Sequence, residues 1–128
     1  MEYGAAVARY FEALGRAGEL PQGLPGLVSG EAEDRTLQVW VRFQLQVQGG
    51  VVQSARFQVF GCPHTVAAAS KVAEWLEGRS SAEARGLDAR AVCAGLNVPV
   101  EKLGKLLRIE DAVAACMSQV AAGNNEGR

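Results

Sequence analysis

One cysteine, Cys62, lies in a sequence context that can activate a thiol. Residues 55–70 (ARFQVFGCPHTVAAAS) read as an alternating strand, then Gly61 and Cys62, then a helix rich in small residues. Pro63 suits the first position of a helix, because its missing N–H would have no partner there, so Cys62 is expected at the N-cap. The helix dipole and the free backbone N–H groups would then favour the thiolate.

Such a thiol suits sulfur transfer, metal binding or redox chemistry. His64, two residues further on, is a candidate second soft ligand or proton carrier. The alternative is a small buried N-cap cysteine without chemistry and a histidine on the surface. Cys116 shares a helical face with apolar residues and Cys93 follows Val92 in a helix, so both are expected to be structural.

Composition and charge exclude several classes of protein. The 128 residues fit one domain, which we place at residues 1–122, with a flexible polar tail at 123–128. The net charge of −1 argues against binding to nucleic acid or anionic membranes. No apolar run is long enough to span a membrane, and the N-terminus does not read as a signal peptide. Three cysteines are too few for a disulfide framework, which indicates a reducing, cytoplasmic setting.

Enzymatic chemistry is not expected from the remaining motifs. No Ser-His-Asp or paired-carboxylate arrangement stands out, and the single histidine makes general acid–base catalysis hard to assign. The Gly-rich loop before the first long strand also lacks the spacing of a phosphate-binding loop. We therefore expect a protein that is not an enzyme.

The hydrophobic pattern predicts the strands that would position Cys62. From Leu37 onwards apolar residues alternate with polar ones, which indicates a half-buried strand with one apolar face. Gly49 and Gly50 are typical of a two-residue hairpin turn, and a return strand is expected over residues 51–60. A third strand is expected within residues 24–34.

Helices are expected before and after these strands in the sequence. They comprise a helix at residues 2–16, one from Cys62 to Gly78, short helices capped by Ser80 (with Glu83) and by Asp88, and a last helix at residues 101–121. Strands followed by helices indicate an α+β fold, in which helices pack on one face of a small antiparallel sheet of about three strands.

Short motifs occur in the order found in one known family. They are Tyr3, Val7 and Phe11 in the first helix, Gly50-Val51-Val52, Ala55-Arg56-Phe57, Phe60-Gly61-Cys62, and Glu110-Asp111-Ala112-Val113. On these motifs the chain resembles the IscU-type iron–sulfur cluster assembly scaffolds, also called the NifU N-terminal domain, over residues 3–121. The resemblance implies an α+β scaffold that assembles a cluster on three cysteines near one end of the sheet, supplied with sulfur by a cysteine desulfurase.

Cys62 stands at one of the three positions where that family has its ligand cysteines, and the other two positions hold no cysteine. The other ligand positions, two in the hairpin and two before the last helix, are held by Leu37, Val39, Gly104 and Lys105. A second register places the first motif at residues 31–34, which carry carboxylates but still no cysteine. Because a [2Fe–2S] cluster or a closed zinc site takes four ligands, Cys62 cannot hold either alone.

Two functions follow from the resemblance. In the first, the protein is a scaffold-like member of iron–sulfur cluster assembly, and Cys62 accepts sulfur or holds part of a cluster, iron or zinc. His64, an acidic residue of residues 31–34 or a second protomer would complete the ligands. In the alternative, a non-metal-binding adaptor docks a partner of the assembly machinery, and Lys105 holds the Cys62 thiolate as an ion pair. A small thiol-redox or metal-delivery protein is a third reading.

The same two functions set the expected partners. We expect the partner to be a cysteine desulfurase or another cluster assembly protein, and we expect the chain to be a monomer or a weak homo-oligomer.

Overall fold

The computed structural model describes residues 16–123 of the chain. The helix expected at residues 2–16, apart from Arg16, and the tail at residues 124–128 lie outside the described residues. The strands are β1 (Leu27–Asp34), β2 (Val39–Gln48) and β3 (Val51–Phe60). The helices are α2 (Pro63–Leu76), α3 (Ser81–Arg85), α4 (Ala89–Val92) and α5 (Leu103–Gly123), with 3₁₀ turns η1 (Ala94–Leu96) and η2 (Val100–Lys102).

The three strands form one antiparallel sheet in the order β1-β2-β3. The strand expected within residues 24–34 is β1, at an edge of this sheet. Gly49 and Gly50, between β2 and β3, have φ angles of 63° and 75°, as a two-residue hairpin turn with matching twist requires. These parts of the predicted sheet are confirmed.

The prediction that the first long strand starts at Leu37 is wrong by two residues. Gln38 has a φ of 55°, and the backbone N–H of Leu37 donates to Oδ1 of Asp34 over 3.0 Å. These features close a turn between β1 and β2, so regular pairing begins at Val39. Leu37 therefore lies in the turn, at the same end of the sheet as Cys62.

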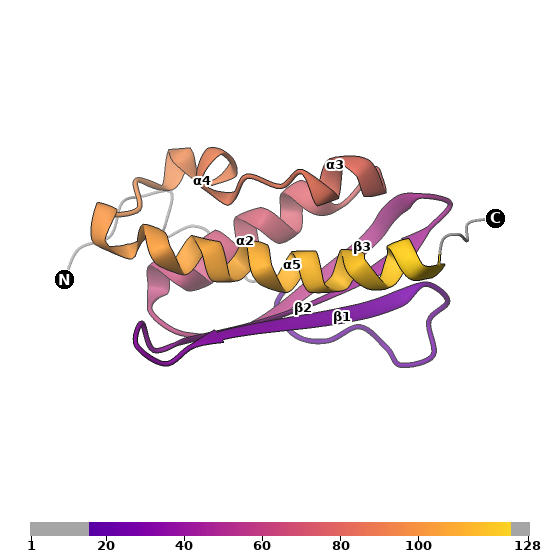
Figure 1. Cartoon of the computed structure of the whole chain (residues 1–128), viewed down its shortest axis with the longest axis horizontal. Helices are drawn as coiled ribbons and strands as arrows, with labels where there is room; N and C mark the ends of the chain where they lie inside the picture. Colours follow the sequence, from indigo (N-terminus) through magenta and orange to yellow (C-terminus); the bar gives the residue numbers. More distant parts are fainter. Residues whose placement is uncertain (1–15, 124–128) are drawn as a thin grey trace.

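The helices cover one face of the sheet, which confirms the predicted α+β fold (Figure 1). α5 packs on β1 and β2, and α2 packs on β3. The core-facing side chains of β2 are fully or almost fully buried: Val39, Val41, Phe43, Leu45 and Val47. The predicted caps are also present: Ser80 and Glu83 form a capping box, and Asp88 accepts the N–H of Ala91. None of the described helices is long and apolar enough to cross a membrane.

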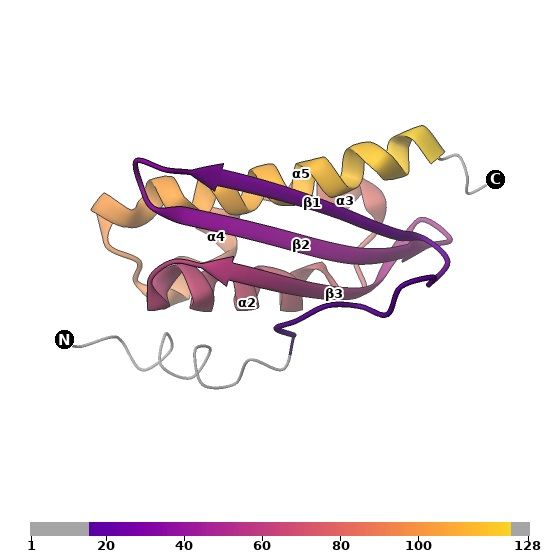
Figure 2. The same ribbon diagram turned by 90° about the horizontal axis from the view of Figure 1, so that it is seen from below.

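The opposite face of the sheet is less open than alternation predicts (Figure 2). Gln44 is only 7% exposed, and its Oε1 accepts the backbone N–H of Leu20 over 2.8 Å. Leu20 is itself buried. The segment that leads into β1 therefore covers part of this face, and it supplies the hydrogen bond that lets a glutamine be buried there.

β1 approaches α5 most closely at Gly30. A Cβ atom added at Gly30 would lie 2.6 Å from Cβ of Ala115 and 2.8 Å from the backbone nitrogen of Cys116. Real Cβ atoms do not come this close to such neighbours, because the repulsion exceeds any gain in packing. The absence of a side chain at Gly30 is thus what lets the edge strand lie against the helix.

Glu77 joins the end of α2 to β3 and to the segment before β1. Its Oε1 accepts hydrogen bonds from Nε and Nη2 of Arg16, both at 2.9 Å, and its Oε2 accepts from the N–H of Ala55 at 3.0 Å and from Nη1 of Arg56 at 3.3 Å. Burial opposes ionisation of this carboxyl, but these hydrogen bonds and the two arginine charges outweigh it, so the pKa of Glu77 is lowered.

Replacing Glu77 with Gln should destabilise the fold by about 1 to 2 kcal/mol at neutral pH, because charge-assisted hydrogen bonds are lost. Because the pKa of Glu77 is lower in the folded protein than in the unfolded chain, its carboxylate stabilises the fold at pH values above the unfolded-state pKa. This stabilisation is lost as the pH falls through the folded-state pKa. The difference between the two proteins in urea unfolding should therefore shrink as the pH falls below the usual range of a glutamate carboxyl.

Glu33→Gln is the matched control for this prediction, since Glu33 is exposed and its ion pair with Arg35, at 3.7 Å, is also exposed. An exposed pair of this kind contributes little. Equal losses of stability from the two substitutions would contradict the role given to Glu77.

Candidate functional site

Cys62 lies in an open pocket of about 740 Å³ at one end of the sheet. Its walls come from the turn between β1 and β2, from the ends of β2 and β3, and from α5; they are Glu33, Asp34, Arg35, Leu37, Gln38, Val39, Trp40, Phe60, Gly61, Cys62 and Lys105. Cys62 is the N-cap of α2 and Pro63 is its first residue, as predicted. The pocket thus combines a helix N-terminus with a half-buried thiol.

The surroundings of Cys62 favour its thiolate. The Sγ lies 3.4 Å from Oγ1 of Thr65, and Nζ of Lys105 donates to it over 3.7 Å. Burial opposes ionisation, but the Thr65 hydroxyl, the backbone N–H groups of Thr65 and His64 and the charge of Lys105 together lower the pKa of Cys62 to about 7. The thiolate of Cys62, which is the nucleophilic form, is therefore available at neutral pH.

The structure places the four positions that the resemblance assigns to ligands at or beside the pocket of this thiol. Leu37, Val39 and Lys105 line the pocket together with Cys62. Gly104 lies behind Leu37: a Cβ at position 104 would lie 3.3 Å from Cδ1 of Leu37. At the positions where the family resemblance places ligands, the pocket thus has an apolar wall and one ammonium group.

The carboxylates of the pocket have other partners. Oδ1 of Asp34 accepts the N–H of Leu37, and its Oδ2 pairs with Arg108 over 3.5 Å. Glu33 pairs with Arg35 over 3.7 Å. Within residues 16–123 no three His, Cys, Asp or Glu side chains are grouped so that they could hold a metal ion. The donor set of the described chain therefore does not fit a four-ligand cluster or zinc site.

His64 is buried, with 9% of its surface exposed, so the alternative of a surface histidine is wrong. Its side chain is not part of the wall of the Cys62 pocket. Burial and the charges of Lys102 and Lys105 lower the pKa of His64, which keeps the imidazole neutral at neutral pH. Its part in the site that the structure shows is the backbone N–H near the Cys62 sulfur, and ligation by its imidazole stays a prediction.

The other two cysteines are in the core, as predicted. Cys93 is 2% exposed and its thiol donates to the carbonyl of Ala68, while Cys116 is fully buried and donates to the carbonyl of Phe43. Burial raises the pKa of both thiols to about 12. Neither is a thiolate near neutral pH, so both lack the nucleophile that Cys62 offers.

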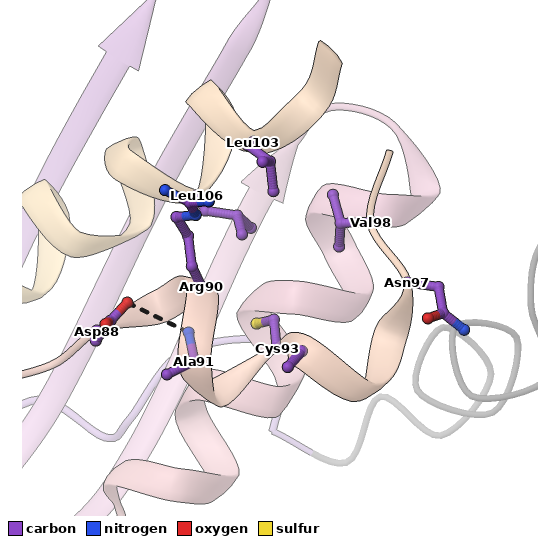
Figure 3. Close-up of a pocket in the computed structure, with 9 residues that line it drawn as sticks. Asp88, Arg90, Ala91, Cys93, Asn97, Val98, Leu103 and Leu106 are labelled. Atoms are coloured by element: carbon purple, nitrogen blue, oxygen red, sulfur yellow. Dashed lines mark hydrogen bonds between the residues drawn. The ribbon is translucent and has the colours of Figure 1, made fainter. Parts of the chain in front are cut away.

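A second pocket of about 450 Å³ lies between α4, η1 and the start of α5 (Figure 3). The figure shows Asp88 turned toward the N–H of Ala91, the helix-capping hydrogen bond of 3.2 Å. Cys93 also lines this pocket, with a pKa too high for reaction near neutral pH. This pocket therefore lacks the activated thiol that distinguishes the pocket of Cys62.

Comparisons with known proteins find relatives among iron–sulfur cluster assembly proteins. The chain is 27% identical over 84 residues to "Iron sulfur cluster assembly protein 1" of Trachipleistophora hominis, covering 66% of this chain and 61% of that protein. It is 28% identical over 101 residues to the "Iron-sulfur cluster assembly scaffold protein IscU" of Buchnera aphidicola, covering 79% and 77%. The chain thus spans less than two thirds of the length of the first of these relatives.

The fold is shared with a solved structure, the N-terminal part of a NifU-like protein from Brucella abortus. The TM-score is 0.75 at 19% identity, over 93% of this chain and 94% of that one. The model of the family described as "NifU-like N terminal domain" matches residues 3–126. The chain is therefore a member of the NifU-like N-terminal domain family.

Proposed function

We propose that this protein acts in iron–sulfur cluster assembly as a scaffold-like protein, and that Cys62 is the thiol that accepts sulfur for it. The observation that carries the proposal is the Cys62 thiolate in an open pocket, with Nζ of Lys105 at 3.7 Å and a pKa of about 7. The assignment to iron–sulfur cluster assembly rests on membership of the family and on a relative that is named a cluster assembly scaffold.

The proposed step is a transfer of sulfane sulfur. The Cys62 thiolate attacks the outer sulfur of a cysteine persulfide on a donor protein, for which a cysteine desulfurase is the partner we propose. A new S–S bond forms at Cys62 while the S–S bond of the donor breaks, and the donor cysteine leaves as a thiolate. No oxidant is needed, because the sulfane sulfur passes between two thiols. The protein is then a stoichiometric acceptor rather than an enzyme.

The same proposal places the protein in the reducing cytoplasm, as a monomer or weak homo-oligomer. All three cysteines of the structure are free thiols, as such a compartment maintains them. Iron or a cluster would be cargo, and its remaining ligands would come from outside the described residues or from a second protein.

One observation favours a second candidate function. Leu37, Val39, Gly104 and Lys105 stand where the family resemblance places ligands, and they surround Cys62 with groups that do not bind metal. An adaptor that docks a partner of the assembly machinery without carrying sulfur or metal would retain the fold and this end of the sheet.

The test is sulfur loading. We expect the purified protein, incubated with a cysteine desulfurase and free cysteine, to gain the mass of one sulfur atom on Cys62. The Cys62→Ser variant should gain none, while Cys93→Ala should load like the wild type if it folds. Thermal unfolding of each variant checks the fold.

Iron, zinc and acid-labile sulfide are measured on the same anaerobically purified samples. Absence of the added sulfur on folded wild type would overturn the proposal and leave the adaptor. Loading on Cys93 or Cys116 instead of Cys62 would overturn the assignment of the site.

A further inference from the structure

We infer that Lys105 determines what Cys62 holds: its ammonium group supplies the counter-charge that a metal ion would supply, so the pocket takes anionic sulfur groups and disfavours divalent cations. The naming of a persulfide as that sulfur group rests on the proposed function. The exclusion of cations rests on the geometry of the pocket alone.

Lys105 is held near Cys62 by the packing of α5. Its Nζ lies 3.7 Å from Sγ of Cys62, 43 residues earlier in the chain. The next residue, Leu106, is 2% exposed and Ile109, one turn on, is fully buried, so this part of α5 is fixed against the core. The fold therefore places the base of the Lys105 side chain beside the pocket that holds Cys62.

Besides Cys62, the side chains of the wall that carry ligand atoms for a cation are those of Glu33, Asp34 and Gln38. Leu37 fills the space in front of Gly104, and Val39, 2% exposed, also lines the pocket. The two nearby carboxylates are paired with arginines, Asp34 with Arg108 and Glu33 with Arg35. A divalent cation at Cys62 would meet one thiolate, apolar carbon, carboxylates already paired with arginines, and the like charge of Lys105.

An anionic sulfur group meets the opposite conditions. The outer sulfur of a persulfide lies about 2.05 Å beyond Sγ, which the pocket of about 740 Å³ accommodates. The side chain of Lys105 reaches the thiolate before transfer, and its flexible stem lets the ammonium follow the charge to the outer sulfur afterwards. The N–H groups at the start of α2 face the same charge.

The test compares two alkylating reagents that differ in charge. Iodoacetate is an anion and iodoacetamide is neutral, and both react with the same thiolate, so the ionised fraction of Cys62 cancels from the ratio of their rates. In Lys105→Met we expect this ratio to fall about fivefold, the factor that one charge about 4 Å away supplies in water-like surroundings. Lys105→Arg should keep most of the ratio.

Lys102→Met is the matched control. It removes the same charge one turn earlier, from a residue that influences His64 but not Cys62. Its ratio should remain that of the wild type. An unchanged ratio in folded Lys105→Met, or an equal fall in Lys102→Met, would overturn the role of Lys105.

Zinc ion provides the second measurement. Stoichiometric Zn²⁺ should leave the alkylation rate of wild-type Cys62 unchanged, whereas in Lys105→Cys, which brings a second thiol to the pocket, it should protect Cys62. Protection of the wild type at stoichiometric Zn²⁺ would overturn the exclusion of cations. Because neither measurement uses a sulfur donor, each can fail while sulfur loading succeeds, and sulfur loading can fail while both succeed.

Discussion

Iodoacetamide is expected to modify Cys62 alone among the three cysteines of the folded protein near neutral pH. The pKa of Cys62 is about 7, whereas burial raises the pKa values of Cys93 and Cys116 to about 12. At neutral pH a gap of about five units makes the thiolate fraction of the buried cysteines smaller by a factor on the order of 10⁴ to 10⁵. Burial then slows their reaction further.

The rate at Cys62 should rise with pH until the thiol is fully ionised and then level off. Its midpoint should fall at about 7, because the thiolate is the reacting form. Peptide mass mapping after short exposure identifies the modified residue, and a urea-unfolded sample, in which all three cysteines react, is the control. Rapid labelling of Cys93 in folded protein, or a midpoint at the free-thiol value, would contradict the prediction.

Gly30→Val should destabilise the protein by about 3 kcal/mol, or prevent folding. Valine is favoured in strands, so intrinsic propensity alone predicts the opposite sign. The clash decides, because even a Cβ would come within 2.6 Å of Ala115 and 2.8 Å of the Cys116 backbone. Relieving it moves β1 away from α5, and such overpacking typically costs about 1 to 3 kcal/mol even where only side chains must shift.

Thermal unfolding measures this effect. A loss of about 3 kcal/mol in a domain of this size lowers Tm by on the order of 10 °C. Gly95→Ala is the matched control, since a Cβ at Gly95 meets nothing within 4 Å and should leave Tm nearly unchanged. A Gly30→Val protein as stable as the wild type would show that β1 and α5 are not packed as described.

The features that the sequence predicted well depend on local rules. The hairpin follows from Gly49 and Gly50, the cap of α3 from Ser80 and Glu83, and the position of Cys62 from Pro63. Each involves residues only a few positions apart, where turn and capping geometry fixes the outcome. The nearness of Lys105 to Cys62 was suggested by the family resemblance, and the structure places them in contact.

The features that were missed depend on contacts between distant segments. The burial of Gln44 requires Leu20, which lies 24 residues earlier and carries no signal in its own sequence that it will cross the sheet. The role of Glu77 requires Arg16, 61 residues away. Periodicity assigns a face to each residue, but it does not tell which other segment will cover that face.

The contact between Leu37 and Gly104 means that the two positions cannot be changed independently. A histidine introduced at position 104 would begin with its Cβ 3.3 Å from the Leu37 side chain, so it would have to displace that side chain before it could face Cys62. A cysteine introduced at position 37 would instead leave the space in front of Gly104 empty. A mutational route that places metal ligands at positions 37 and 104 therefore passes through single changes that each weaken the packing, and filling both positions calls for paired substitutions.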